Sequence, residues 1–539
     1  MVKLAANTLP NDINTLKSLL HAAQQQLENK DQQIETQDQR ILGLQNIIEE
    51  LIAEKRLAQA RHFGASSEKM PLQYYLFDEA EQFDGEGLDT SSEETSNNER
   101  VEVKPHQRRP GGRKPLPEDL PRVRIEHELA VHERQCQCGC TLEKIGEVHC
   151  EQIDIIPAQV YVIDHARFKY HCKSCHNTPV VAPLPPQAIP KSQASAGFLA
   201  YIATSKYADG LPLYRQCHMF NRIGIEQQRQ TLANHMIKAG TLTQPLINLL
   251  QESGLHSGYV QMDETTVQVL NEPGKSASSQ SQMWVMRGGP PDKPVVTFHY
   301  DPTRRQSVPE RLLADYSGYL QTDGYAGYNS VLSSEDIQGL GCLAHVRRKY
   351  TDAQKSLGKD SRQGKRVKKA LGFIGQLYAI EKTVKDSDVE ARYHARQQDS
   401  LPLLAEFKEW LDNQSITAKS KLGQAITYTL NQWPRLLVYC EDGRLHIDNN
   451  GIENKIRPFA VGRRNWLFSS SQRGATASAN LYSLIETAKD NRLNEYAYLK
   501  HIFTELPKAE CVEDFEKLLP WNVDTEKLDQ LTKYPVKNT

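Results

Sequence analysis

Three acidic residues have the types and settings that metal-assisted phosphoryl transfer requires. Asp263 lies within "QMDETT", in a stretch whose apolar and polar residues alternate as in a β-strand, and Asp323 follows a second such stretch in "QTDGYAGY". Glu453 lies within "DNNGIENKIRPF", which is predicted to be helical. Two Mg²⁺ or Mn²⁺ ions about 3.5–4 Å apart, held by such acids, bind the attacking and leaving oxygens of an in-line displacement. We therefore expect Asp263, Asp323 and Glu453 to form one catalytic site of oxygen ligands for metal.

Other polar residues in these segments have structural interpretations. Glu264 is next in the chain after the first acid, but it points to the opposite face because side chains alternate along a strand. Asp448 precedes "NNGIEN" and is placed to cap the helix that begins there. Asn450 and Asn454 are candidates to orient Glu453 or a phosphate. Glu453, rather than Asp448, is therefore the predicted third acid.

Basic side chains surround these acids in the sequence. "HVRRKY" places His345 and two arginines at a predicted helix start, and three arginines and Trp466 follow Glu453. Arginines and an aromatic ring beside an acidic metal site are typical of a DNA backbone held against the metals. An intramolecular salt bridge is the alternative for each arginine, and His345 alone is predicted to be structural. The predicted DNA-binding residues are Arg347, Arg348, Arg457, Arg463 and Arg464.

Close pairs of cysteines predict a structural zinc site. Cys172-x-x-Cys175 has the spacing of a zinc knuckle, in which two thiolates bind one tetrahedral ion. Cys136 and Cys138 are the other two predicted ligands, with Cys140 as an alternative to either. In a reducing cytosol this pattern favours a metal over disulfides, and free thiols in a small sheet are the alternative.

The elements that position the acids follow from periodicity. From residue 258 the pattern predicts three strands, a helix, a strand, a helix and a strand, then a helical insert and another helix. This order suits a mixed α/β sheet of the ribonuclease-H-like type. The predicted strands cover 258–270, 282–287 and 294–301, and a short helix covers 306–316. Residues 318–329 are predicted to be a strand that ends in a Gly-rich turn, and a fifth strand at 339–346 is predicted to run into a helix.

The N-terminal segment is predicted to mediate self-association. Apolar residues recur every seven positions from Ile13 to Ile48, which predicts a coiled coil. One long helix packed on its own protein is the alternative. Residues 78–102 hold ten acids and one basic residue, and this composition predicts a disordered linker. A basic run at 104–117 follows, which suits a phosphate backbone or is a solvated linker.

Residues 195–255 carry a helical pattern. Short helices joined near Gly210 and Gly224 are compatible with a helix-turn-helix-like unit, although this signal is weak. The region is therefore a candidate for DNA binding.

Composition limits the class of protein and its location. A chain of 539 residues is too long for one compact hydrophobic core, which predicts several domains. Its net charge of −2 creates no overall electrostatic field that attracts nucleic acid, so DNA binding must come from local basic patches. No apolar run approaches the roughly 18–20 residues of a membrane span, and the first apolar stretch is too short for a secretory signal. We expect a cytoplasmic protein with no membrane partner.

Motifs in chain order resemble the insertion-sequence-66 class of DDE transposases. They are "RHFGASSEK", "TSKYADGLPLYRQ", "MDET", "TDGYAGY", "GCLAHVRRKY", "DNNGIENKIRPFAVGRRNWLFS", "YSLIETAKDN" and "LLPWN". The resemblance implies a coiled-coil region, a zinc-binding domain and a ribonuclease-H-like core with a helical insert. It also implies Mg²⁺-dependent cleavage and joining of DNA strands at transposon ends, and the family's catalytic acids carry over onto Asp263, Asp323 and Glu453.

The resemblance implies partners as well. These are transposon-end and target DNA at the nucleoid, further copies of the same chain, and small accessory proteins encoded by the same element. The crowded Cys136, Cys138 and Cys140 cluster departs from the wider pair of many relatives. A zinc-finger regulator without chemistry is one rival interpretation, against which the three acids argue. A ribonuclease on the same fold is another, against which the coiled coil and the zinc domain argue.

The predicted organisation has eight parts. They are a coiled coil (1–77), a linker (78–118), a zinc-binding domain (119–182), a helical region (183–257), a first part of the catalytic core (258–350), a helical insert (351–440), a second part of the core with Glu453 (441–490) and a C-terminal helical tail (491–539).

Overall fold

The computed structural model describes residues 160–170, 180–357 and 361–532, together with separate positions between 12 and 37, most of them helical. The chain divides into two compact units, one of 1–85 with 165–539 and one of 86–164, and every element named below belongs to the first. The predicted linker and most of the predicted coiled coil lie outside the described residues. So do all four predicted zinc ligands, Cys136, Cys138, Cys172 and Cys175.

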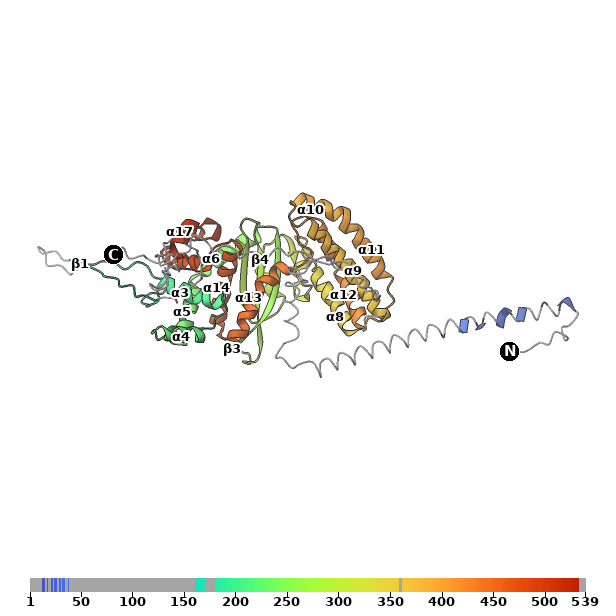
Figure 1. The fold of residues 1–539 in the computed structure, drawn as a ribbon, viewed down its shortest axis with the longest axis horizontal. Helices are drawn as coiled ribbons and strands as arrows, with labels where there is room; N and C mark the ends of the chain where they lie inside the picture. Colours follow the sequence, from blue (N-terminus) through green and yellow to red (C-terminus); the bar gives the residue numbers. More distant parts are fainter. Residues whose placement is uncertain are drawn as a thin grey trace, which may run out of the picture. The chain divides into compact units, whose positions relative to one another are not determined.

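A mixed sheet forms the centre of this unit (Figure 1). Its longest strand, β3, is antiparallel to β4, which in turn is antiparallel to β5. On its other side β3 is parallel to β6, and β6 is parallel to β7, so the order is β5-β4-β3-β6-β7. The short β8 pairs in parallel with the end of β3. The strands are β3 (Tyr259–Asn271), β4 (Gln280–Gly288), β5 (Val295–Asp301), β6 (Gly318–Gln321), β7 (Ile337–Leu340) and β8 (Ser469–Ser471).

The strand predicted at 339–346 is shorter than expected. The segment 318–329 is a strand that ends in a turn, as predicted: β6 ends at Gln321, and the turn contains a short 3₁₀ helix at Ala326–Tyr328. β7 ends at Leu340, and helix α8 (Leu343–Ser356) begins inside the strand predicted at 339–346. The backbone N–H of Leu343 donates to the carbonyl of Ile447, which follows the insert in the chain. A short apolar run does not distinguish strand from helix, so the local sequence does not locate this boundary.

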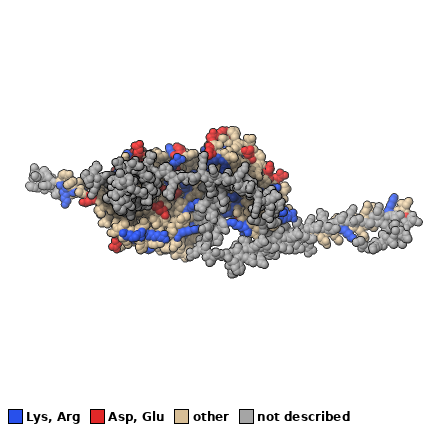
Figure 2. Space-filling view, viewed as in Figure 1, with Lys and Arg blue, Asp and Glu red and all other residues tan. Residues whose placement is uncertain are grey.

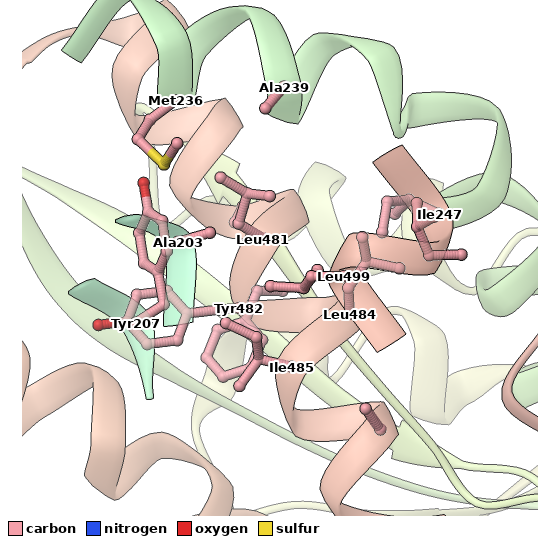
Figure 3. Packing of buried hydrophobic residues seen from close by; sticks show 14 of the residues in the cluster. Ala203, Tyr207, Met236, Ala239, Ile247, Leu481, Tyr482, Leu484, Ile485 and Leu499 are labelled. Carbon is pink, nitrogen blue, oxygen red and sulfur yellow. The ribbon is translucent and has the colours of Figure 1, made fainter. Parts of the chain in front are cut away.

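Helix α14 (Gln472–Asp490) covers the edge of the sheet at β5. Its Ser483 and Thr487 hydroxyls accept hydrogen bonds from the N–H groups of Phe298 and Val296, at 2.7 and 3.0 Å. These bonds satisfy backbone donors that an edge strand leaves unpaired. The same helix packs its apolar side chains against four other helices (Figure 3), namely α3 (Ala196–Tyr207), α5 (Arg229–Leu242), α6 (Gln244–Leu255) and α15 (Glu495–Glu505).

The predicted helices at 195–255 are confirmed. α4 (Leu213–Arg222) lies between α3 and α5, and the two connections contain Gly210 and Gly224 with φ of +69° and +82°. Positive φ is a conformation that glycine adopts without a steric penalty, so these residues permit the sharp turns between helices.

The predicted helical insert is also confirmed and has its own apolar core with α8. It consists of α9 (Arg362–Thr383), α10 (Val389–Ala395), α11 (Leu401–Asp412) and α12 (Lys421–Leu437). The chain then returns to the sheet through α13 (Asn450–Trp466), and the C-terminal tail adds α15, α16 (Val512–Glu516) and α17 (Thr525–Thr532). Among the described helices, none is long and apolar enough to cross a membrane.

Candidate catalytic site

Asp263 and Asp323 extend from two neighbouring parallel strands. β3 and β6 pair Gln261 with Gln321, and each aspartate follows its glutamine by two residues. Both carboxylates therefore emerge at the same end of the sheet, because parallel strands run in one direction and side chains repeat every second residue. Asp263 is 7% exposed and its Oδ1 accepts the N–H of Glu264 at 2.8 Å. Asp323 Oδ1 accepts the N–H of Tyr325 at 2.8 Å.

Glu453 lies in the first turn of α13, which packs on β3. The side chain is 2% exposed and faces two residues of α8. Arg348 Nη2 lies 3.7 Å from Glu453 Oε2, and His345 Nδ1 lies 3.8 Å from Oε1. Burial, followed by the charges of Arg348 and Lys349, lowers the pKa of His345 to about 3, so its imidazole is neutral. The predicted structural role of His345 agrees with this contact.

The charges of two predicted acids, Asp323 and Glu453, act on the third, Asp263. The pKa of Asp263 is raised well above its ordinary value, first by burial and then by the charges of Asp323, Glu264 and Glu453. Asp323 and Glu453 therefore both lie within electrostatic range of Asp263.

The three carboxylates are the kind of ligand that a divalent cation requires. Buried carboxylates that repel each other offer the oxygen ligands and the negative charge that such a cation neutralises. In the described ranges, no three His, Cys, Asp or Glu side chains form a ready-made metal-binding group. The acids fit a divalent metal in the chemistry and charge of their oxygens, but the described side chains are not gathered into one three-ligand group.

Glu264 points away from the other acids but anchors the loop that carries Asp323. Its carboxylate pairs with Arg304, through Arg304 Nε at 2.7 Å, and accepts the Tyr328 hydroxyl at 2.8 Å. The Arg304 guanidinium lies 3.7 Å from the centre of the Tyr325 ring. Burial and then the charge of Asp323 raise the pKa of Glu264. Glu264 is thus a separate position, as predicted, yet it remains within electrostatic range of Asp323.

A buried amide network, which sequence reasoning missed, connects β3, β6 and the segment before α13. Gln321 Oε1 accepts hydrogen bonds from Gln261 Nε2 at 2.8 Å and from the Tyr259 hydroxyl at 2.6 Å. Gln321 Nε2 donates to the carbonyl of His446 at 2.9 Å, and Asn449 Nδ2 donates to the carbonyl of Met262 at 3.3 Å. The repeated pattern Gln-x-Asp in both strands was the signal that could have identified it.

Asp448 and Asn450 bond to each other at the start of α13, next to Asn449, which is the N-cap residue. Asp448 Oδ1 accepts the N–H of Asn450 at 3.1 Å, so Asp448 satisfies a free donor of the first helical turn, as expected. Asn450 Nδ2 donates to Asp448 Oδ2 at 3.0 Å, so it orients Asp448. Asn454 is exposed.

The predicted DNA-binding arginines divide into two groups. Arg348 faces Glu453, and Arg463 donates to the Thr265 and Thr266 hydroxyls of β3 at 3.2 and 3.0 Å. Burial, then Arg464, lowers the pKa of Arg463 to about 10. These contacts match the alternative interpretation of intramolecular pairing, and DNA binding by these two residues stays a prediction. Arg464 is exposed, whereas Arg347 and Arg457 are half-buried.

Comparisons with known families cover most of the chain. Residues 191–477 match the sequence model described as "Transposase IS66 family", and residues 483–521 match its C-terminal element. Residues 133–176 match the zinc-finger binding domain of transposase IS66, and residues 50–125 match "Transposase C of IS166 homeodomain".

Similar chains occur in Sinorhizobium fredii under names that state no function. The uncharacterized protein y4qI is 30% identical over 95% of this chain and 97% of its own length. The uncharacterized protein y4jD is 31% identical over 77% of this chain and 83% of its own. The family models span both the sheet with its three acids and the segments before it. This chain therefore belongs to the IS66 family of transposases.

Proposed function

We propose that this protein is a DDE-type transposase that cleaves and joins DNA strands at the ends of its insertion sequence, with Mg²⁺ or Mn²⁺ as cofactor. The observation that carries the proposal is the placement of Asp263 and Asp323 at the same end of two parallel strands, with Glu453 on a helix 130 residues further along within electrostatic range of Asp263. Burying the carboxylates of Asp263 and Glu453 costs stability, and such a cost is typical of functional sites.

The strand order supports a ribonuclease-H-like core. Three antiparallel strands are followed by two that lie parallel to the first, in the order β5-β4-β3-β6-β7. An acid on the first strand and one after the fourth strand, beside each other, agree with this fold. Fold alone does not imply function, so the proposal depends on the acids.

Each residue has a distinct part in the proposed reaction. Bound divalent ions would activate the attacking oxygen and stabilise the leaving 3′-oxygen. Asp263 and Asp323 would hold the metal from the sheet, and Glu453 would hold it from α13. Arg348 keeps Glu453 in place across 3.7 Å, and the exposed Arg464 is suited to a flanking phosphate.

Zinc and self-association belong to the proposal as supporting parts. The zinc-finger match at 133–176 contains Cys136, Cys138, Cys172 and Cys175, which we propose as structural zinc ligands, with Cys140 as the alternative. The N-terminal region is proposed to multimerise the chain through a coiled coil, as the joining of two transposon ends requires. We propose that small accessory proteins of the element and nucleoid DNA in the cytoplasm complete the set of partners.

The test is strand cleavage of a supercoiled plasmid that carries the ends of the element. Wild-type protein with Mg²⁺ is expected to nick at the ends, and Asp263→Asn, Asp323→Asn and Glu453→Gln are each expected to reduce the rate by about 10⁴-fold. Glu526→Gln, an exposed acid on α17, is the matched control and should cleave normally. Nicking that survives Asp263→Asn would contradict the site. Cleavage of RNA–DNA hybrids without any need for end sequences would indicate a ribonuclease instead.

A further inference from the structure

The outer face of α4 and α5 has an unusual charge composition. Between residues 210 and 251 the chain contains one acid, Glu226, although acids make up about one residue in eight of the whole sequence. Four cations occupy the same segment, and all four are exposed. In the described part of the chain, none of the four forms an ion pair with an acid. They are Arg215, Arg222, Arg229 and Lys238.

Packing decides which side of these helices faces solvent. α4 buries Gln216 and Phe220, and α5 buries Leu232, Met236 and Ala239 against neighbouring helices. The opposite side presents amides as well as cations. Gln230 and Asn234 are both exposed on one face of α5, and Gln230 Nε2 donates to Asn234 Oδ1 at 3.4 Å.

This face adjoins the end of the helix that carries Glu453. Asn465, near the end of α13, donates through Nδ2 to the carbonyl of Gly210 at 2.9 Å. Lys206 Nζ lies 5.0 Å from the centre of the Trp466 ring. In Figure 2, Lys and Arg side chains gather along the lower margin, where Figure 1 places α4 and the adjoining end of β3. Arg464, in the last turn of the same helix α13, is exposed as well.

We infer that the α4–α5 face binds the duplex of the transposon end, with the first turns of α5 in the major groove. An α-helix fits that groove, where Gln and Asn side chains recognise adenine. In helix-turn-helix units, the N-terminal part of the second helix contacts the bases. Gln230 and Asn234 would read bases, while Arg215 and Arg222 would contact phosphates. This inference rests on the proposed function, since it names the DNA surface of the same enzyme.

The experiment measures binding of the full-length protein by fluorescence anisotropy, without added magnesium. The probes are a labelled duplex of the element's end and a shuffled duplex of the same length and composition. The double variant Gln230→Ala/Asn234→Ala is expected to lose about 10-fold or more of the preference for the end sequence. Its affinity for the shuffled duplex should not change.

The phosphate contacts are tested by salt dependence. Arg215→Gln/Arg222→Gln is expected to weaken binding of both duplexes and to reduce the slope of log K against log salt by about 0.9 for each contact. Lys527→Gln, an exposed cation on α17, is the matched control and should leave the slope unchanged. Because all these side chains are exposed, the variants are expected to fold, and an unchanged thermal midpoint checks this.

Two results would overturn the inference. One is a wild-type protein without preference for the end sequence, and the other is a Gln230→Ala/Asn234→Ala protein that keeps its preference. Sequence-preferring binding of the end duplex without strand cleavage would instead contradict the proposed function, and the inference about the α4–α5 face would still hold.

Discussion

Two neighbouring acids of β3 differ in their tasks because they point to opposite faces of the sheet. Asp263 lies on the face where the charges of Asp323 and Glu453 raise its pKa. Glu264 accepts hydrogen bonds from Arg304 and from Tyr328 on the other face. Through these partners it anchors the turn after Asp323, so it acts as a positioning residue in the proposed site. A shift of one residue in the register of β3 would exchange the two roles.

The raised pKa of Asp263 leads to a prediction about stability. Burial and the neighbouring carboxylates raise its pKa well above 3.8, so the folded protein binds more protons than the unfolded chain above that pH. Stability contributed by this group is therefore present at low pH and is lost as pH rises toward the folded-state pKa. Asp263→Asn removes the free-energy cost of an ionised Asp263 in the folded protein at pH 7. It should therefore raise the thermal midpoint by roughly 2–4 °C for each 1 kcal/mol gained in the free energy of unfolding.

Thermal unfolding of both proteins from pH 4 to pH 7 checks this prediction. The difference between them should shrink as pH falls, and added Mg²⁺ should raise the midpoint of the wild type only. Asp386→Asn, an exposed aspartate of the insert, is the control. A variant less stable than wild type at pH 7 would contradict the assigned cause.

Between elements, buried amides set the position of α13 relative to the two strands. Gln261 and Gln321 pair across β3 and β6, and Gln321 also donates to carbonyls at Gly341 and His446. A Cβ at Gly451 would lie 2.5 Å from Gln261 Oε1, so the first turn of α13 packs directly on this network. The network therefore links the strand ends that carry two acids to the helix that carries the third.

Gln321→Leu is expected to destabilise the catalytic core. The change removes the acceptor of the Tyr259 hydroxyl, one of the two acceptors of the Gln261 amide and the donor to two carbonyls, and we expect a loss of about 3 kcal/mol in the free energy of unfolding. Urea denaturation followed by tryptophan fluorescence measures it. Gln338→Leu, on the neighbouring β7 with its side chain exposed, should change stability by less than about 0.5 kcal/mol. Equal effects of the two substitutions would argue against the network.

Across the whole of this unit, one arginine connects the helical insert to the catalytic core. Arg396 is 1% exposed and pairs with Glu381 of α9 through two bonds of 2.8 and 2.7 Å. Its remaining donors reach the carbonyls of Tyr439, Asp442 and Leu445, at 2.9, 2.9 and 3.0 Å. These carbonyls belong to the segment that leads from the insert to α13, so the insert helps to position Glu453.

Arg396→Met should therefore disturb both the insert and the site. It leaves Glu381 and three carbonyls without their partner, and breaking a buried ion pair in this way costs about 3–5 kcal/mol. Strand cleavage should fall along with the urea midpoint. Arg444→Met is the control, because Arg444 is 51% exposed and its pair with Asp442 is expected to contribute about 0–1 kcal/mol. A normal urea midpoint for Arg396→Met would show that the insert and the core are independent.

Much of the secondary structure was predictable because its signals are local. The alternation around Asp263 predicts β3, and the helical pattern at 195–255 predicts α3 to α6, as the structure confirms. The end of β7 was not predictable, because a short apolar run does not distinguish strand from helix, and the N–H groups of Gly341 and Leu343 bond to residues far along the chain. Among the arginines, local sequence could not show that Arg463 donates to β3 while Arg464 remains exposed.

The sequence by itself predicted which side chains hold metal in the proposed site, because carboxylates at two strand ends and on one helix have few other joint uses. It also determined the family, through motifs spread along the chain. Only the tertiary structure decided that the charges of Asp323 and Glu453 raise the pKa of Asp263. It also decided that hydrogen bonds of buried amides connect β3, β6 and the segment before α13. The reason is physical: charge coupling and buried hydrogen bonds depend on distances between segments far apart in the chain, which local periodicity does not encode.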